Sequence, residues 1–181
     1  MDKSELRAMV RAQPPVSSAV SAAVVERLFE LMSARIPGTV SAFLAMEGEV
    51  DVSPLFSRLP GWRWVLPRVE ADRSLTFRDR DVPREIHRFG MSQPIDAGPV
   101  IPVHEIDVML TPGLAFDRHG GRLGNGGGFY DRVLSRRRSD SVAIGVTITA
   151  RVFDEVPMDD HDQRVDRVVT EFEIIECSTR T

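Results

Sequence analysis

The glycine loop between Gly120 and Gly128 constrains the fold of this chain more than any other feature. It holds six of the 13 glycines, and it lies between an apolar run over residues 106–110 and a helix-compatible run over residues 129–138. Glycine permits positive φ and lets a ligand approach the main chain without meeting a Cβ. A loop that leads into a helix also presents unpaired N–H groups. The order strand, glycine loop, helix therefore predicts a phosphate-binding loop.

The charge around this loop differs from that of the rest of the chain. Residues 112–138 hold six arginines and two aspartates, a net +4, so the remainder of a chain of net charge −4 carries −8. A basic island in an acidic chain favours an anionic ligand. The alternative is a surface loop that is rich in glycine for conformational reasons alone. The loop is neither a P-loop nor a dinucleotide fingerprint, because no glycine precedes Lys-Ser or Lys-Thr and Phe129 stands where the last fingerprint glycine would be.

Length and composition bound the class of protein. The length of 181 residues suits one domain, residues 1–181. Hydrophobic residues make up 42% of the chain and charged residues 28%, a composition that excludes a disordered chain. A pI near 5.6 argues against a nucleic-acid binder. Cys177 is the single cysteine, which excludes an internal disulfide and fits a reducing compartment. With neither a signal-like start nor an 18-residue apolar run, we expect a cytoplasmic protein without a membrane partner.

Hydrophobic periodicity predicts alternating helices and strands. We expect helices over residues 4–11, 53–59, 129–138 and 150–156. A further helix is expected to begin after a cap at Ser17 or Ser18 and to end at Pro37. We expect strands over residues 39–46, 62–66, 75–78, 106–110, 142–146, 167–170 and 172–175, with an irregular segment over 79–103. Strand, helix and strand over 106–146 is typical of a parallel crossover. The prediction is a three-layer α/β/α single domain with a mostly parallel sheet.

Charged side chains at three places are candidates for binding. Lys3 and Arg7 lie one turn apart on the first helix, where a solvated surface is the plain alternative. Glu49 stands in an acidic turn after a buried strand. If that strand is parallel, its carboxyl end is a place where ligands bind. A polar loop without a binding role is an equally good interpretation of this turn. Asp162 belongs to an acidic loop over 159–162 whose hard oxygen ligands suit magnesium, although such loops are usually only solvated.

Other chemistries find no support in the sequence. The four histidines are scattered without the spacing of zinc ligands. A nucleophile elbow of the Gly-x-Ser-x-Gly type is absent, and Cys177 stands in a polar tail. The sequence therefore does not suggest covalent catalysis through serine or cysteine.

Three segments around the glycine loop, Leu110 to Asp117, Gly121 to Gly124 and Gly126 to Arg132, resemble the signature of the 5-formyltetrahydrofolate cyclo-ligase (methenyltetrahydrofolate synthetase) family. Further pieces occur in that family's order. They are Lys3 to Arg7, Phe43 to Asp51, Leu66 to Arg68, Phe89-Gly90 before Gln93-Pro94, His161-Asp162 and Val165-Asp166. The resemblance covers nearly the whole chain and implies the cyclo-ligase type of fold, which is CoA-transferase-like.

The resemblance also implies an activity and a site. The activity is ATP-dependent conversion of 5-formyltetrahydrofolate to 5,10-methenyltetrahydrofolate, with ATP and Mg²⁺ as cofactors. The resemblance assigns ATP contacts to Lys3, Arg7, Arg122, Leu123, Gly124, Asn125, Gly126, Gly127, Gly128, Phe129 and Tyr130. It assigns substrate contacts to Leu44, Glu49, Asn125, Gly126, Gly127, Gly128 and Phe129, catalytic roles to Arg122 and Tyr130, and magnesium to Asp131 and Asp162. Phe89 and Pro94 are expected as pocket walls.

The chain departs from the family pattern at two of these positions. Bacterial members usually carry tyrosine where Asn125 stands, and often tyrosine at Phe129. Two alternatives therefore stay open: a relative that uses the ATP loop on another small substrate, and a catalytically silent binder of folate or nucleotide. The expected partners are small molecules only, and the protein is expected to be a monomer or a homodimer.

Overall fold

The computed structural model describes residues 1–88 and 90–177 and is built around a seven-stranded sheet. Its strands are β1 (Thr39–Ser41), β2 (Arg63–Val69), β3 (Leu75–Asp79), β6 (Val108–Pro112), β9 (Val142–Val146), β11 (Arg167–Val169) and β12 (Ile174–Glu176). The strand order is β12-β11-β9-β6-β1-β2-β3. The inner pairs are parallel, and the edge pairs β2–β3 and β11–β12 are antiparallel. The prediction of a mostly parallel sheet is confirmed.

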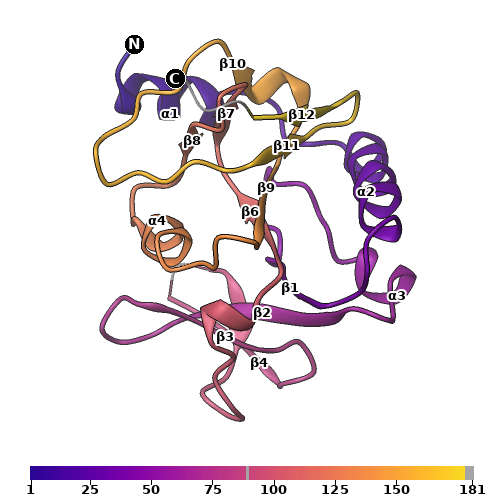
Figure 1. Ribbon diagram of the computed structural model, residues 1–181. Helices are drawn as coiled ribbons and strands as arrows, with labels where there is room; N and C mark the ends of the chain where they lie inside the picture. Colours follow the sequence, from indigo (N-terminus) through magenta and orange to yellow (C-terminus); the bar gives the residue numbers. More distant parts are fainter. Residues whose placement is uncertain (89, 178–181) are drawn as a thin grey trace.

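Helices cover both faces of this sheet, which gives the predicted three layers (Figure 1). The helices are α1 (Lys3–Arg11), α2 (Ser18–Ser33), α3 (Leu55–Arg58) and α4 (Phe129–Leu134), with 3₁₀ turns η1 (Val103–Glu105) and η2 (Thr149–Arg151). α2 and α3 lie on one face and α4 lies on the other. Successive residues of β6 show the alternation, since Leu110 packs on the α2 face and Met109 on the α4 face. No helix in the described part of the chain is long and apolar enough to cross a membrane.

The parallel strands bring the candidate segments to one edge of the sheet. β1 leads to the turn that carries Glu49, β6 leads to the glycine loop, and β9 leads to η2. Ligands of open α/β sheets bind beyond the carboxyl ends of the strands. The fold therefore places the predicted binding residues at the edge where a site is expected.

A small sheet folds the glycine loop and supports α1. It consists of β10 (Val152–Phe153), β7 (Ala115–Asp117) and β8 (Arg122–Leu123), in that order. Leu6 and Val10 are fully buried and pack against the small sheet. Figure 1 shows α1 beside β7 and β8. Asp2 caps α1 in a capping box with Glu5, which satisfies free N–H groups of the first turn.

Several elements differ from the expected ranges. β1 ends at Ser41 instead of residue 46, and α4 ends at Leu134 instead of residue 138. Beyond α4 the side chains of Arg137 and Arg138 pair with Asp166 and Asp107, and these bonds hold a segment of turns that leads into β9. The brief helix expected over 150–156 is the turn η2 followed by β10.

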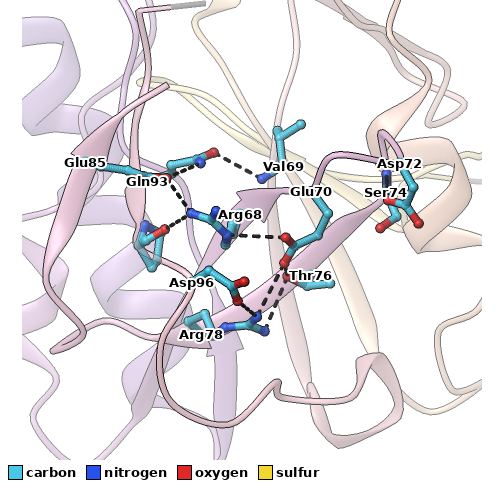
Figure 2. A network of polar contacts seen from close by, with 11 residues as sticks. Arg68, Val69, Glu70, Asp72, Ser74, Thr76, Arg78, Glu85, Gln93 and Asp96 are labelled. Carbon is cyan, nitrogen blue, oxygen red and sulfur yellow. Dashed lines mark hydrogen bonds and ion pairs between the residues drawn. The ribbon is translucent and has the colours of Figure 1, made fainter. Parts of the chain in front are cut away.

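The segment expected to be irregular contains a hairpin of β4 (Arg84–Ile86) and β5 (Ser92–Pro94). A polar network holds it to β2 and β3 (Figure 2). Gln93 is buried; its amide oxygen accepts the Val69 N–H at 3.1 Å and its amide nitrogen donates to Glu85 at 3.1 Å. Arg68 donates to the Pro94 carbonyl at 2.7 Å. These hydrogen bonds join residues far apart in the sequence, so hydrophobic periodicity did not predict them.

Candidate active site

Helix α1 lies against the glycine loop and brings its cations there. Arg7 donates from Nε to the Gly124 carbonyl at 3.0 Å, and Arg11 donates from Nη2 to Asn125 Oδ1 at 3.2 Å. A Cβ at Gly126, where φ is +102°, would lie 3.7 Å from the Arg7 guanidinium. Gly128, at φ +63°, caps α4 in the left-handed conformation. A non-glycine residue would be strained at both positions, so the loop keeps its main chain open beside Arg7.

Arg122 organises the end of the loop that leads into α4. Its buried guanidinium donates from Nη2 to Asp131 Oδ1 at 2.9 Å and lies 5.6 Å from the centre of the Tyr130 ring. Asp131 Oδ1 also accepts the Gln163 N–H at 3.2 Å, which joins α4 to the acidic loop. The Nε of Arg122 is buried and has no hydrogen-bond partner among the described residues. A buried donor of this kind is available to an anionic ligand.

Lys3 binds the acidic loop from the other side. Its ammonium contacts Asp162 and lies 2.6 Å from Asp159 Oδ2. Burial opposes its charge, but the two carboxylates outweigh burial and raise the pKa of Lys3. Burial alone would raise the pKa of Asp162, yet the Asp159 N–H and Lys3 hold that pKa below its usual value. Among the described residues, Asp159, His161 and Asp162 form a group whose ligand atoms lie within 4.8 Å of one another.

Glu49 lies in a tight turn at the carboxyl end of β1. Its N–H donates to the Met46 carbonyl at 3.0 Å, and its Oε2 accepts the Met46 N–H at 2.9 Å. Burial raises the pKa of Glu49, while the Met46 N–H and the charge of Arg151 act in the opposite direction. Burial also raises the pKa of Tyr130, with the charge of Glu49 adding to the effect and Arg122 opposing it. Glu49, Tyr130 and Arg122 therefore share one electrostatic environment.

The structure does not bring every predicted residue to this cluster. Leu44 packs on the α2 face of the sheet, whereas Phe129 and Tyr130 pack on the α4 face. Pro94 is buried in β5 and accepts from Arg68. Phe89 lies outside the described residues.

Two residues that sequence reasoning missed stand next to predicted ones. Asp159 shares Lys3 with Asp162, and its position three residues earlier in the same acidic loop was the available signal. Arg151 is buried and donates to the Gly48 carbonyl at 2.5 Å. No local pattern around Arg151 marked it, because its partner lies 103 residues away in the sequence.

Two surface hollows lie apart from this cluster. One of about 430 Å³ is at the amino ends of the strands, where Arg138 in its lining pairs with both Asp107 and Asp140. The other, of about 290 Å³, is lined by Arg80, which donates to the Phe56 carbonyl. Neither hollow lies at the carboxyl ends of the parallel strands, where ligands bind in such folds.

Nucleophilic catalysis by the single thiol does not fit its environment. Cys177 is partly buried, and burial beside Asp117 and Asp166 raises the pKa of its thiol to about 12. The thiolate is the reactive form, so this cysteine is a poor nucleophile at neutral pH.

Comparison with known proteins decides the family. A model described as the 5-formyltetrahydrofolate cyclo-ligase family matches residues 3–171. The chain belongs to the 5-formyltetrahydrofolate cyclo-ligase family. A member from Escherichia coli strain K12 is 34% identical over 140 residues, which cover 73% of this chain and 77% of that protein. A member from Mycolicibacterium smegmatis is 40% identical over 83 residues, 45% of this chain and 43% of that protein.

Solved structures agree with the fold of this cyclo-ligase family member. The NMR structure of the Aquifex aeolicus 5,10-methenyltetrahydrofolate synthetase matches with a TM-score of 0.84 and 31% identity, over 100% of this chain and 96% of that one. A Mycoplasma pneumoniae 5,10-methenyltetrahydrofolate synthetase matches with a TM-score of 0.77 over 94% of this chain and 99% of that one. At 21% identity, the second likeness supports the fold alone.

Proposed function

We propose that this protein converts 5-formyltetrahydrofolate to 5,10-methenyltetrahydrofolate, using ATP and releasing ADP and phosphate. The observation that carries the proposal is the packing of α1 on the glycine loop, in a chain of the cyclo-ligase family. Arg7 bonds to Gly124, and Lys3 bonds to the acidic loop next to α4. Two helix cations beside a glycine loop form a binding place for the phosphates of a nucleotide.

The phosphates are held by main-chain and cationic groups of the cluster. Lys3 and Arg7 contribute from α1, and the loop contributes the amides of residues 123–130. Arg122 contributes its buried guanidinium, whose Nε has no partner among the described residues. In phosphoryl transfer, catalysis consists mostly of positioning and charge stabilisation, which is the part we assign to Arg122.

Asp131 and Asp162 are the proposed ligands of Mg²⁺. The donor set fits this ion, because magnesium takes oxygen ligands and commonly uses one or two carboxylates together with substrate phosphates. The Gln163 N–H bonded to Asp131 places the residue next to Asp162 against α4, which supports the pairing of these two aspartates in one site. When bound, the ion neutralises charge on the transferring phosphate.

Glu49 is the proposed anchor of the pterin ring. A carboxylate pairs strongly with adjacent N–H donors of a planar ring. Phe129, Asn125 and residues 126–128 lie on the neighbouring loop and α4, where they form the wall of the substrate pocket. We assign Leu44 a substrate contact as well, by its match to the family motif rather than by its packing.

The reaction has two covalent stages. The formyl oxygen attacks the γ-phosphorus of ATP, the bond to the bridging oxygen breaks, and ADP leaves with that electron pair. N10 of the folate then attacks the formyl carbon, phosphate leaves with the carbon–oxygen electrons, and N10 loses its proton. Tyr130 orients the formyl group or the γ-phosphate. Its raised pKa keeps the hydroxyl protonated and able to donate a hydrogen bond.

The departures from the family pattern favour a second candidate function, in which the protein acts on another small substrate. Asn125 bonds to Arg11 and is exposed, so a polar contact with α1 stands where other members carry an aromatic wall. A relative with this loop but another small substrate would bind ATP without needing the folate. We propose further that the protein works in the cytoplasm, as a monomer or a homodimer, on small molecules alone.

A thermal-shift titration tests the proposed function. A ligand that binds only the folded state raises the melting temperature with its concentration. We expect Mg-ATP and 5-formyltetrahydrofolate each to stabilise the protein. Stabilisation by Mg-ATP alone would favour the relative with another substrate, and stabilisation by the folate alone would favour a silent folate-binding protein.

A further inference from the structure

Arg151 is a buried arginine whose partners belong to two separate segments of the site. Its side chain is nearly inaccessible, and it lies in η2, directly after β9. Nη1 donates to the Gly48 carbonyl at 2.5 Å, and Nε donates to Gln13 Oε1 at 3.3 Å. Gln13 returns a bond from its amide nitrogen to the Ala150 carbonyl at 3.3 Å. The guanidinium therefore ties two distant loops to the end of a central strand.

These two loops lead to the two halves of the proposed site. Gln13 follows the last turn of α1, the helix that carries Lys3 and Arg7. Gly48 precedes Glu49, and its φ of +83° makes the tight turn that aims the Glu49 side chain. A rigid planar donor suits such a junction better than a flexible ammonium, because its bonds have fixed directions.

The charge of Arg151 also needs a counter-charge. A guanidinium stays protonated in proteins, and a buried charge is costly unless it is compensated. Burial lowers the pKa of Arg151, and the carboxylate of Glu49 acts against that lowering. The attraction is mutual, since Arg151 favours the ionised form of Glu49.

We propose that Arg151 is a positioning residue for the folate half of the site, which fixes the Glu49 turn relative to α1 and holds Glu49 in its carboxylate form. The inference rests on the proposed function. It adds a residue with no role in phosphate or magnesium binding, and its effect reaches the substrates through Gly48, Glu49 and Gln13.

The first test compares Arg151→Gln with Arg80→Gln. Arg80 also joins two segments through a guanidinium-to-carbonyl bond, 2.8 Å to Phe56, but it lies outside the site. With folding verified by circular dichroism, Arg151→Gln should raise the KM for the folate by about 10- to 100-fold, which is the loss expected for hydrogen bonds from a charged group. The KM for ATP should change by less than about 3-fold, within the context scatter of a single contact. Arg80→Gln should leave both KM values unchanged.

The second test reads the pH profile of kcat/KM for the folate. Three groups face Glu49: the Met46 N–H of its own turn, Arg151 from η2, and Tyr130 from α4 with Arg122 beside it. Removal of the Arg151 charge raises the pKa of Glu49, so the acid limb should move to higher pH in Arg151→Gln. Arg151→Lys keeps the charge and should leave the acid limb near that of the wild type.

Gln13→Ala keeps the proposal testable if Arg151→Gln does not fold. Gln13 is only partly buried, and its removal frees Arg151 Nε without changing any charge. We expect a higher folate KM and an unmoved acid limb. The proposal is overturned if Gln13→Ala and Arg151→Gln leave the folate KM unchanged, or if they raise both KM values equally. An inactive wild-type protein would instead contradict the proposed function, so the two failures are distinguishable.

Discussion

Each proposed magnesium ligand has a cation beside it. Asp131 pairs with Arg122, and Asp162 pairs with Lys3. The side chain of Asp162 is 10% exposed, whereas that of Asp159 is 61% exposed, so solvent screens the second contact of Lys3 far more. The two aspartates of the acidic loop are therefore not equivalent.

Neutral substitutions of these aspartates test the metal assignment. Asp131→Asn and Asp162→Asn should fold normally, lose most turnover and need more magnesium for the activity that remains, because each removes one hard oxygen charge. The measurement is a magnesium titration of the reaction rate. Asp159→Asn is the matched control and should show the same magnesium dependence of the reaction rate as the wild type. An equal loss of turnover in Asp159→Asn would instead indicate that the metal binds nearer the exposed end of the loop.

Asn125→Tyr tests the missing aromatic wall. A tyrosine at this exposed position gives up the bond to Arg11 and offers a ring to the folate. We expect a lower folate KM, equivalent to about 1 to 3 kcal/mol for one good stacking contact, with little change in the KM for ATP. Steady-state kinetics with each substrate varied in turn measures both. An unchanged or higher folate KM would indicate a pocket built for a different ligand.

The half-buried carboxyl of Glu49 predicts a pH dependence of folate use. Burial raises the pKa of Glu49 above the ordinary value of about 4.3, so protonation begins at a higher pH than in a free glutamate. Because the proposed pterin anchor is the ionised form, kcat/KM for the folate should fall as the pH falls through this raised pKa. Glu49→Gln should show a low value with no acid limb from this group. An acid limb that persists in Glu49→Gln would belong to another group.

At this scale, the sequence motifs predicted the cluster better than the periodicity did. Arg7 bonds to the Gly124 carbonyl, and Arg122 bonds to Asp131 beside the Tyr130 ring. Lys3 bonds to the acidic loop. The binding roles of these residues stay predictions. Arg151 was missed, because its partner lies 103 residues away in the sequence. Contacts over such separations depend on how the segments pack, which one sequence does not display.

Among the elements, α1 has the closest link to function. Its apolar face, Leu6 and Val10, packs on the small sheet, and its cations extend to the glycine loop. The cap at Asp2 accepts from the Ser4 and Glu5 amides at 2.7 and 2.9 Å. Loss of the cap loosens the first turn, which carries Lys3.

Asp2→Ala should lower the melting temperature by about 2 to 4 °C and raise the KM for ATP more than that for the folate. Ser17→Ala is the control, because Ser17 caps α2 through the Val20 amide, away from the site. Ser17→Ala should lower the melting temperature by a similar amount and leave both KM values unchanged. Equal KM changes in the two variants would mean that general stability, and not α1, sets ATP binding.

Element types were predictable where the hydrophobic pattern was long. β9 covers 142–146 as expected, α1 begins one residue before its predicted start, and α2 is capped by Ser17, one of its two predicted caps. The ends of β1 and α4 were wrong. Apolar residues 42–44 pack as coil beyond β1, and tertiary ion pairs of Arg137 and Arg138 replace the last helical turn. Propensity gives way to tertiary contacts at such ends.

For the whole molecule, the three-layer arrangement follows from apolar strands between amphipathic helices, and the sequence sufficed to predict it. The parallel inner strands then bring the Glu49 turn, the glycine loop and η2 to one edge. The small sheet and the β4–β5 hairpin, which were not predicted, support that edge from the sides. Pairing between strands of two or three residues leaves too little pattern to recognise.

The most direct measurement of the central claim is a turnover assay of the purified protein with Mg-ATP and 5-formyltetrahydrofolate. Methenyl absorbance and ADP release are followed together, with folding verified beforehand. The account predicts that absorbance rises only when both substrates and magnesium are present, with one ADP released for each methenyl product. ADP release without methenyl product would support the proposed ATP site and contradict the proposed folate reaction. No change in either signal at high enzyme concentration would contradict the account as a whole.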